Sequence, residues 1–210
     1  MPRRRSLTHV QIAEAALAVI DRAGLDGLSM RVVARELGVS TMALYRYVED
    51  REHLEGLVVD HMLASVDVSL PADLPWQERV AVLLERMREA VGAHPAAVPL
   101  TVVHRHAAPN LLRCAEALLG VLTEAGFTGR GRAVALRALL AHVIGALALM
   151  HLGPLAGQGT AAMGDLPVER YPHLADTARR ARQIPPDEEF RRGLDIVLCG
   201  LAVDGGAVPG

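Results

Sequence analysis

The chain has 210 residues, of which 51% are hydrophobic, and its formal net charge at pH 7 is only −2. This length is enough for one large domain or two small ones with a buried core. Aromatic residues make up only 3% of the chain, and Ala, Leu and Val supply most of the hydrophobic content, which favours helices over strands. The near-neutral charge does not indicate a polycation, although residues 1–51 hold eight Arg against six acidic residues.

The cysteines and the apolar segments indicate a soluble protein of a reducing compartment. Cys114 and Cys199 both lie in apolar stretches with helical periodicity, without the spacing of a metal site, so we expect both to be small buried hydrophobic residues. The most apolar run, 138–153, contains two histidines and is short for a membrane span. We therefore expect a cytoplasmic protein with no membrane segment, no metal and no cofactor.

Four helices are predicted in the first 65 residues, and each starts at a side chain that can accept hydrogen bonds from free backbone N–H groups. These capping residues are Thr8, Ser29, Ser40 and Asp50. The corresponding helices are expected over 8–23, 29–36, 40–47 and 51–65. Gly38 separates the second helix from the third, and a glycine can adopt the positive φ of a tight turn. Two short helices joined in this way are typical of a helix-turn-helix unit.

The third predicted helix has an unusual outer face. Leu44 and Val48 are four residues apart and should point into the core. The remaining positions point outward or to the flanks: Thr41, Met42, Ala43, Tyr45, Arg46 and Tyr47. Small residues allow a helix to approach base edges in the major groove, and phenol and guanidinium groups suit phosphate oxygens. The face therefore favours DNA binding, and the alternative is a plain three-helix packing unit with surface tyrosines.

Residues 7–63 resemble the N-terminal domain of the TetR (tetracycline repressor) family of bacterial transcription regulators. The most specific stretch is LSMRVVARELGVSTMALYRYV, followed by an acidic and then a basic residue. The resemblance implies two sets of DNA contacts. Residues near base edges would be Arg31, Thr41, Met42, Ala43 and Arg46, and residues on phosphates would be Tyr45, Tyr47 and Arg51. Arg51 stands where the family usually has Lys, which keeps the charge and changes the geometry. Glu49 and Asp50 add negative charge beside this face.

The rest of the chain is also predicted to be helical, so the expected fold class is all-α. Two prolines within 67–75 indicate a boundary between a DNA-binding domain, 1–67, and a second domain, 68–210. Within the second domain, helices are expected over 75–92, 95–105, 109–125, 129–153, 171–183 and 187–203. Residues 154–170 are rich in Gly, Pro and small side chains, so a long, mobile loop is expected there.

The resemblance implies that the second domain forms a homodimer and binds a small-molecule effector. The candidate dimer helices are 130–153 and 187–203, whose leucines must partly face the monomer core. The effector itself cannot be identified from the sequence. Weak candidates for contacting it are His104, His106, His142 and Met150. The ordinary alternatives are a surface or partly buried position for His104 and His106, and a core or interface histidine hydrogen-bonded to backbone for His142.

The resulting hypothesis is a homodimeric repressor that binds double-stranded operator DNA and is released by an effector. The predicted fourth helix belongs to both domains and would transmit the change. The first alternative is an activator, or a regulator controlled by a protein partner. The second is a helical enzyme that uses His104 or His106 as a general base, but the sequence has no nucleophile elbow, phosphate-binding loop or other catalytic motif. We therefore predict no catalytic residues.

Overall fold

The structure, a computed structural model, describes residues 6–152 and 157–204, without the side chains of 150–152 and 204. These residues form helices connected by turns, and no strand occurs among them, which confirms the all-α prediction. The chain divides into two compact units, residues 1–121 and 122–210.

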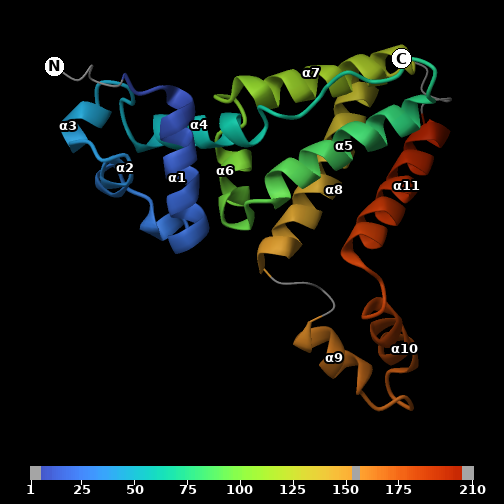
Figure 1. Cartoon of the computed structure of the whole chain (residues 1–210). Helices are drawn as coiled ribbons and strands as arrows, with labels where there is room; N and C mark the ends of the chain where they lie inside the picture. The colour runs from blue at the N-terminus through green and yellow to red at the C-terminus, as the bar shows by residue number, and fades with distance from the viewer. Residues whose placement is uncertain (1–5, 153–156, 205–210) are drawn as a thin grey trace. The chain divides into compact units, whose positions relative to one another are not determined.

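The first unit begins with the helices predicted for DNA binding (Figure 1). They are α1 (His9–Ala23), the 3-10 turn η1 (Leu25–Gly27), α2 (Met30–Glu36), α3 (Thr41–Leu44) and α4 (Arg51–Met62). All four predicted caps are confirmed. Thr8 forms a reciprocal capping box with Gln11, and Asp50 Oδ1 accepts a 2.8 Å hydrogen bond from the His53 amide.

These helices enclose a small core. The α1 helix packs against both α2 and α4, and α2 packs against α3. The side chains at the centre are fully buried and come from α1, α2, α3, α4 and the turn after α3: Ile12, Ile20, Val33, Leu44, Val48 and Leu54. Leu44 and Val48 lie on either side of residues 45–47, the turn that follows α3. Their burial therefore fixes this turn to the core.

The first unit continues with α5 (Trp76–Gly92), η2 (Pro95–Ala97), α6 (Val98–Val103) and most of α7 (Pro109–Glu124). The α4 helix packs against α6. It is also tied to the start of α7, because Asp60 Oδ1 accepts a 2.6 Å hydrogen bond from the Asn110 amide. The Arg113 guanidinium donates to the carbonyl of Val66, which follows α4, over 3.0 Å. Polar contacts thus hold α4 and the residues just after it to α7, in addition to hydrophobic packing.

The second unit contains α8 (Gly129–Leu152), α9 (Gln158–Gly164), α10 (Pro172–Ala181) and α11 (Pro186–Asp204). Helix α9 lies within 154–170, where a continuous loop was predicted; of that range, 154–156 are outside the described residues. The helix packs on α10, and Arg179 donates a 3.0 Å hydrogen bond to the Gly164 carbonyl. Packing of this kind can stabilise a helix whose Gly-rich sequence has low intrinsic propensity.

Helices α8 and α11 approach each other closely at one point. The His142 ring stacks on Phe190 with the ring centroids 5.0 Å apart, and its Nε2 lies 2.9 Å from the Phe190 carbonyl oxygen. A Cβ atom at Gly193 would come within 2.6 Å of the His142 ring. Any larger residue at 193 would therefore force the His142 ring to move.

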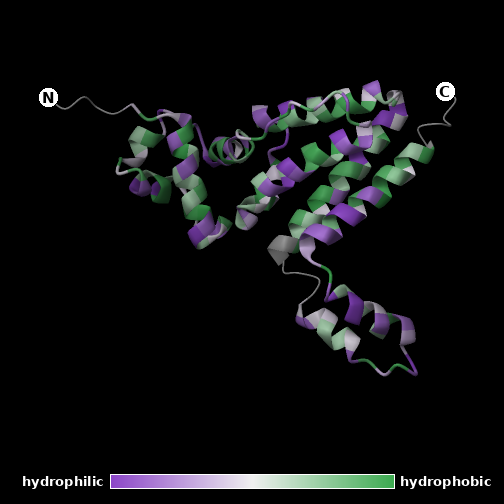
Figure 2. Cartoon of the chain, turned by 45° about the vertical axis from the view of Figure 1, so that its right-hand side comes forward, coloured by the Kyte–Doolittle hydropathy of each residue, from purple (hydrophilic) through white to green (hydrophobic). Residues whose placement is uncertain are grey.

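Both helices keep apolar residues on the outside, and Figure 2 shows hydrophobic residues recurring along the last helix before the C-terminus. In α8, the 21-residue segment Gly129–Leu149 has a mean hydropathy of 1.7, enough in length and composition to cross a membrane, although the run 138–153 alone was judged short. Only 22% of the most apolar part of this segment is buried inside the chain. Helix α8 therefore leaves most of its apolar surface uncovered by the rest of the described chain.

Candidate nucleic-acid interface

The turn between α2 and α3 has the geometry of a helix-turn-helix unit. Gly38 has φ of +69°, in the left-handed region that other residues rarely adopt. Beyond it, the Val39 amide donates a 2.9 Å hydrogen bond to the Ala34 carbonyl. Ala34 is 1% exposed, so its small side chain allows the turn to fold back onto α2. The turn therefore holds α3 at a fixed angle to α2.

Helix α3 is shorter than predicted, 41–44 rather than 40–47. Ser40 Oγ caps its start by accepting a 3.2 Å hydrogen bond from the Ala43 amide. The end is a tight turn, because the Tyr47 amide donates to the Leu44 carbonyl only three residues back. One helical turn followed by this tighter turn still buries Leu44 and Val48 completely, as predicted.

The predicted DNA-binding side chains of this segment lie on one exposed ridge. Met42 is 75% exposed and Tyr45 is 46% exposed, and Arg46 is exposed as well. Three neighbours are half-buried: Thr41, Ala43 and Tyr47. The outer face of this ridge thus combines a thioether, a phenol and a guanidinium.

Two contacts outside the ridge support its backbone and its neighbour α2. The Nε2 atom of His9, the first residue of α1, lies 3.2 Å from the Tyr47 carbonyl oxygen. Arg22 of α1 donates a 2.8 Å hydrogen bond to Glu36 of α2, and this bond lowers the pKa of the Glu36 carboxyl. Helix α1 thus holds both helices of the unit. Arg31, at the start of α2, is exposed and has no role in this support.

Arg51, predicted to bind phosphate, has intramolecular partners in the structure. Its Nε donates to Glu55 Oε1 over 2.6 Å, and its Nη2 donates to the Leu25 carbonyl over 3.1 Å. Half of the side chain remains exposed. The contact with Leu25 spans 26 residues, so no local sequence signal could have indicated it. The phosphate contact of Arg51 stays a prediction.

The candidates for effector binding differ in their local surroundings. His104 is 2% exposed and lies beside Glu55, whereas His106 is exposed. The backbone hydrogen bond expected for His142 is confirmed by its contact with Phe190. The side chain of Met150 lies outside the described residues. Among the residues that the structure describes, no group of three or more His, Cys, Asp or Glu could hold a metal ion.

A helix-turn-helix unit with an exposed reading ridge, followed by further helices, is the architecture of a DNA-binding regulator of transcription. Comparison with known proteins supports this class. Residues 12–54 match the domain described as bacterial regulatory proteins, tetR family, and residues 70–204 match the tetracyclin repressor-like C-terminal domain.

Individual relatives are similar over nearly the whole chain. The transcriptional repressor DrrR1 of Streptomyces coeruleorubidus is 31% identical over 94% of this chain and 78% of its own length. The class A tetracycline repressor of Escherichia coli is 30% identical over 91% of this chain and 88% of its own length. The structure of ActR from Streptomyces coelicolor in complex with actinorhodin has 28% sequence identity and a TM-score of 0.82, covering 96% of this chain and all of ActR.

The chain belongs to the tetR family of bacterial regulatory proteins. It is therefore a DNA-binding transcriptional regulator, from a family of regulators rather than of enzymes.

Proposed function

We propose that this regulator is a homodimeric repressor that binds double-stranded operator DNA and leaves it when a small molecule binds the second domain. The domain boundary that we propose is between residues 67 and 68, after α4. The observation that carries the proposal is the exposed ridge of α3, held to a buried core by Leu44 and Val48. Acting on chromosomal DNA, the protein would work in the cytoplasm, and the proposal includes no catalytic step.

On the DNA, the ridge would enter the major groove with its amino-terminal end toward the bases. Thr41, Met42, Ala43 and Arg46, with Arg31 from α2, would lie near base edges. Tyr45 and Tyr47, together with Arg51, would lie near phosphates, which set orientation rather than sequence. In α3 the short Thr41 and Ala43 side chains leave room for close approach, and Met42 supplies an apolar contact.

The dimer would form through the outer faces of α8 and α11. Several leucines of α11 that the sequence suggested for this role are buried within the chain: Leu194, Leu198 and Leu201. The residues left on the surface follow a separate helical stripe, Ile196, Cys199 and Val203, with Ile196 and Val203 about three-quarters exposed. The burial predicted for Cys199 is therefore wrong, whereas Cys114 is buried as predicted. Helix α8 adds Val134, Ile144 and Leu149, each at least 36% exposed. Two such faces from each subunit would form an apolar four-helix contact.

Similar proteins whose structures contain a bound small molecule support the proposal of a small-molecule effector. ActR structures contain actinorhodin or (S)-DNPA, and several relatives are named tetracycline repressors. Effector binding in the second domain would shift the balance between two arrangements of α4. Because both half-sites must be engaged at once, a changed separation of the two α3 ridges lowers operator affinity.

Transcription of the adjacent gene tests the direction of regulation. Deleting the gene for this protein should raise transcription from the promoter that the protein binds, and restoring it should lower transcription again. A fall on deletion would show an activator instead. If transcription rises on deletion and falls again only when a second protein is also present, control by a protein partner would be favoured.

A thermal-shift screen tests the effector. A compound that binds only the folded protein raises the melting temperature by mass action. Actinorhodin and tetracycline are suitable first probes, followed by a collection of hydrophobic metabolites. A compound that raises the melting temperature should also release the protein from its operator; stabilisation without release would contradict the proposed mechanism.

A further inference from the structure

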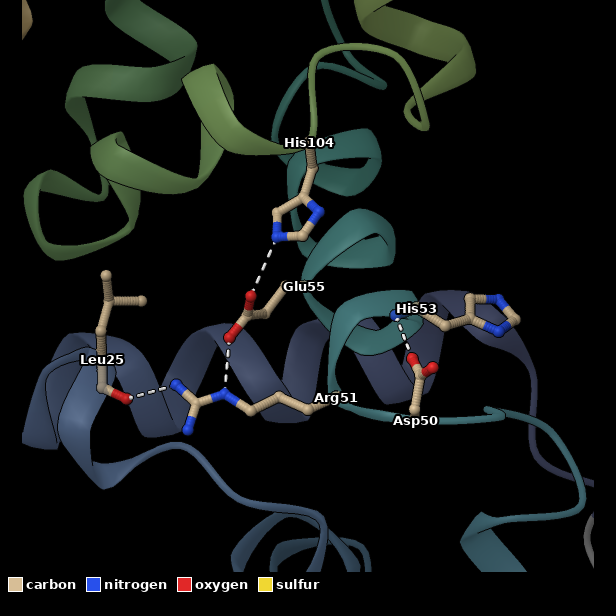
Figure 3. Close-up of polar contacts among 6 residues, drawn as sticks. All are labelled: Leu25, Asp50, Arg51, His53, Glu55 and His104. Atoms are coloured by element: carbon tan, nitrogen blue, oxygen red, sulfur yellow. Dashed lines mark hydrogen bonds and ion pairs between the residues drawn. The ribbon is translucent and has the colours of Figure 1, made fainter.

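A chain of polar contacts connects the end of α6 to the turn η1, through two side chains of α4 (Figure 3). His104 Nε2 lies 2.9 Å from Glu55 Oε2. The other oxygen of the same carboxylate, Oε1, accepts a 2.6 Å hydrogen bond from Arg51 Nε. The same guanidinium donates through Nη2 to the Leu25 carbonyl over 3.1 Å. Residues 25, 51, 55 and 104 are thus connected in series.

The inner end of this chain is buried. His104 is 2% exposed and the Glu55 side chain is 14% exposed. Within the described part of the protein, the buried Nδ1 of His104 has no hydrogen-bond partner. The ring proton therefore belongs on Nε2, from which it donates a hydrogen bond to the Glu55 carboxylate. The negative charge of Glu55 is balanced by Arg51, so each member of the chain depends on the next.

Helix α4 is hydrogen-bonded to α7 as well as to the end of α6. The carboxyl-terminal half of α4 is bonded to α7 through Asp60 and Asn110. The segment that ends at His104 begins at His94, whose Nδ1 lies 2.8 Å from Asp21 of α1. The segment 94–104 is therefore joined at one end to α1 and at the other end to α4. The His104 end continues further, through Arg51, to the backbone of η1.

The Leu25 carbonyl is a sensitive end point. It accepts hydrogen bonds from both Arg51 and the Leu28 amide, each 3.1 Å long. Leu28 is followed at once by Ser29, the cap of α2. Because hydrogen bonds weaken steeply with distance and angle, a displacement of His104 would alter the geometry at this carbonyl and so at the start of α2.

We propose that His104, Glu55 and Arg51 act together as positioning residues that transmit the position of the end of α6 to the helix-turn-helix unit. A test of this proposal by operator affinity rests on the proposed function, whereas a test by hydrogen exchange does not. The role of Arg51 in this chain needs a planar group that donates in two directions, which a lysine ammonium cannot reproduce in the same geometry.

Hydrogen exchange in the full-length protein tests the connection directly. His104→Phe keeps a ring but removes both ring nitrogens, and with them the hydrogen bond to Glu55. It should therefore speed exchange of the Leu28 amide by about 2- to 30-fold. His104→Gln retains an N–H donor at similar reach and should restore slow exchange. In an Arg51→Ala background, His104→Phe should have no further effect on Leu28. Slow exchange of the Leu83 and Leu84 amides in α5 would show that each variant is folded; if His104→Phe does not fold, Glu55→Ala is read in the same way.

Operator affinity gives the second readout, with the DNA fragment that the wild-type protein retains. His104→Phe should change the dissociation constant by about 2- to 30-fold, and this change should vanish when Arg51 is already Ala. Asp176→Asn is the control, because it breaks an exposed pair with Arg180 in the second unit and should leave both readouts unchanged. Unchanged Leu28 exchange in His104→Phe, or effects that add independently of Arg51, would overturn the proposal. If no DNA is bound at all, the proposed function fails while the exchange experiment still decides this inference.

Discussion

The side chains on the α3 ridge differ in what they can contribute to DNA recognition. Arg46 carries a rigid fork of donors that fits the base edge of guanine, whereas the Tyr45 hydroxyl can make one bond to a phosphate. Both are exposed and lie next to each other in the chain. Replacing Arg46 should therefore affect both DNA affinity and base preference, whereas replacing Tyr45 should affect affinity alone.

Replacing Arg46 by Ala should weaken operator binding by about 1–3 kcal/mol and relax the preference at one base pair. The comparison is Tyr45→Phe, which should weaken binding to all sequences evenly because a phosphate contact carries no base information. Fluorescence anisotropy on the operator and on single-base variants measures both. Unchanged affinity and preference in Arg46→Ala would remove that residue from the reading face, and altered preference in Tyr45→Phe would contradict its phosphate assignment.

At the scale of elements, local signals predicted most helices well. Thr8, Ser29, Ser40 and Asp50 start their helices because side-chain caps act over three residues. Features that depend on distant packing were missed. Helix α9 needs α10 beside it, and the end of α3 is set by a turn that helical periodicity does not reveal.

The candidate site was predictable only in part, for the same reason. The burial of Leu44 and Val48 follows from their spacing, and it fixes which residues of the ridge face outward. The polar chain through Glu55 joins residues up to 49 positions apart, and such pairs have no signature in a single sequence. The leucine pattern of α11 likewise did not distinguish the core face from the outer face, because both are apolar.

The turn before α3 should depend on glycine at residue 38. Gly38→Ala should lower the free energy of unfolding by about 1–2 kcal/mol, because a Cβ is disfavoured at φ of +69°. Gly120→Ala in α7 is the control, since φ there is not positive and space is available, and it should raise stability by about 0.5–1 kcal/mol. Urea unfolding measures both. Equal stability of wild type and Gly38→Ala would mean that the turn does not have this conformation.

The contact between α1 and α2 should make stability depend on pH in the acidic range. Arg22 lowers the pKa of Glu36 below its ordinary 4.5, so the folded state gains stability above that pH and loses it as pH falls through the lower value. The wild type should therefore be more stable than Glu36→Gln near neutral pH, and the difference should shrink as the pH falls below 4.5 and the carboxylate is protonated. Chemical unfolding at several pH values measures it. A difference that grows on acidification would contradict this sign.

At the scale of the whole molecule, dimerisation decides whether two ridges can be used together. Ile196→Glu would place a charge in the apolar face of α11 and should raise the dimer dissociation constant at least about tenfold, or about 1.4 kcal/mol. Val168→Glu is the control, because Val168 is likewise an exposed β-branched apolar residue but lies outside α8 and α11. Analytical ultracentrifugation measures the association. Equal dimerisation of Ile196→Glu and the control would place the interface elsewhere.

The central claim is that this protein reads DNA as a symmetric pair. Selection of bound fragments from genomic DNA at about 0.15 M salt, followed by footprinting, tests this most directly. The retained fragments should share an inverted repeat whose half-sites are about one helical turn apart, or a multiple of it, and each site should bind two chains or a multiple of two. Retention of no duplex, or of a site without two-fold symmetry bound by a single chain, would contradict the account.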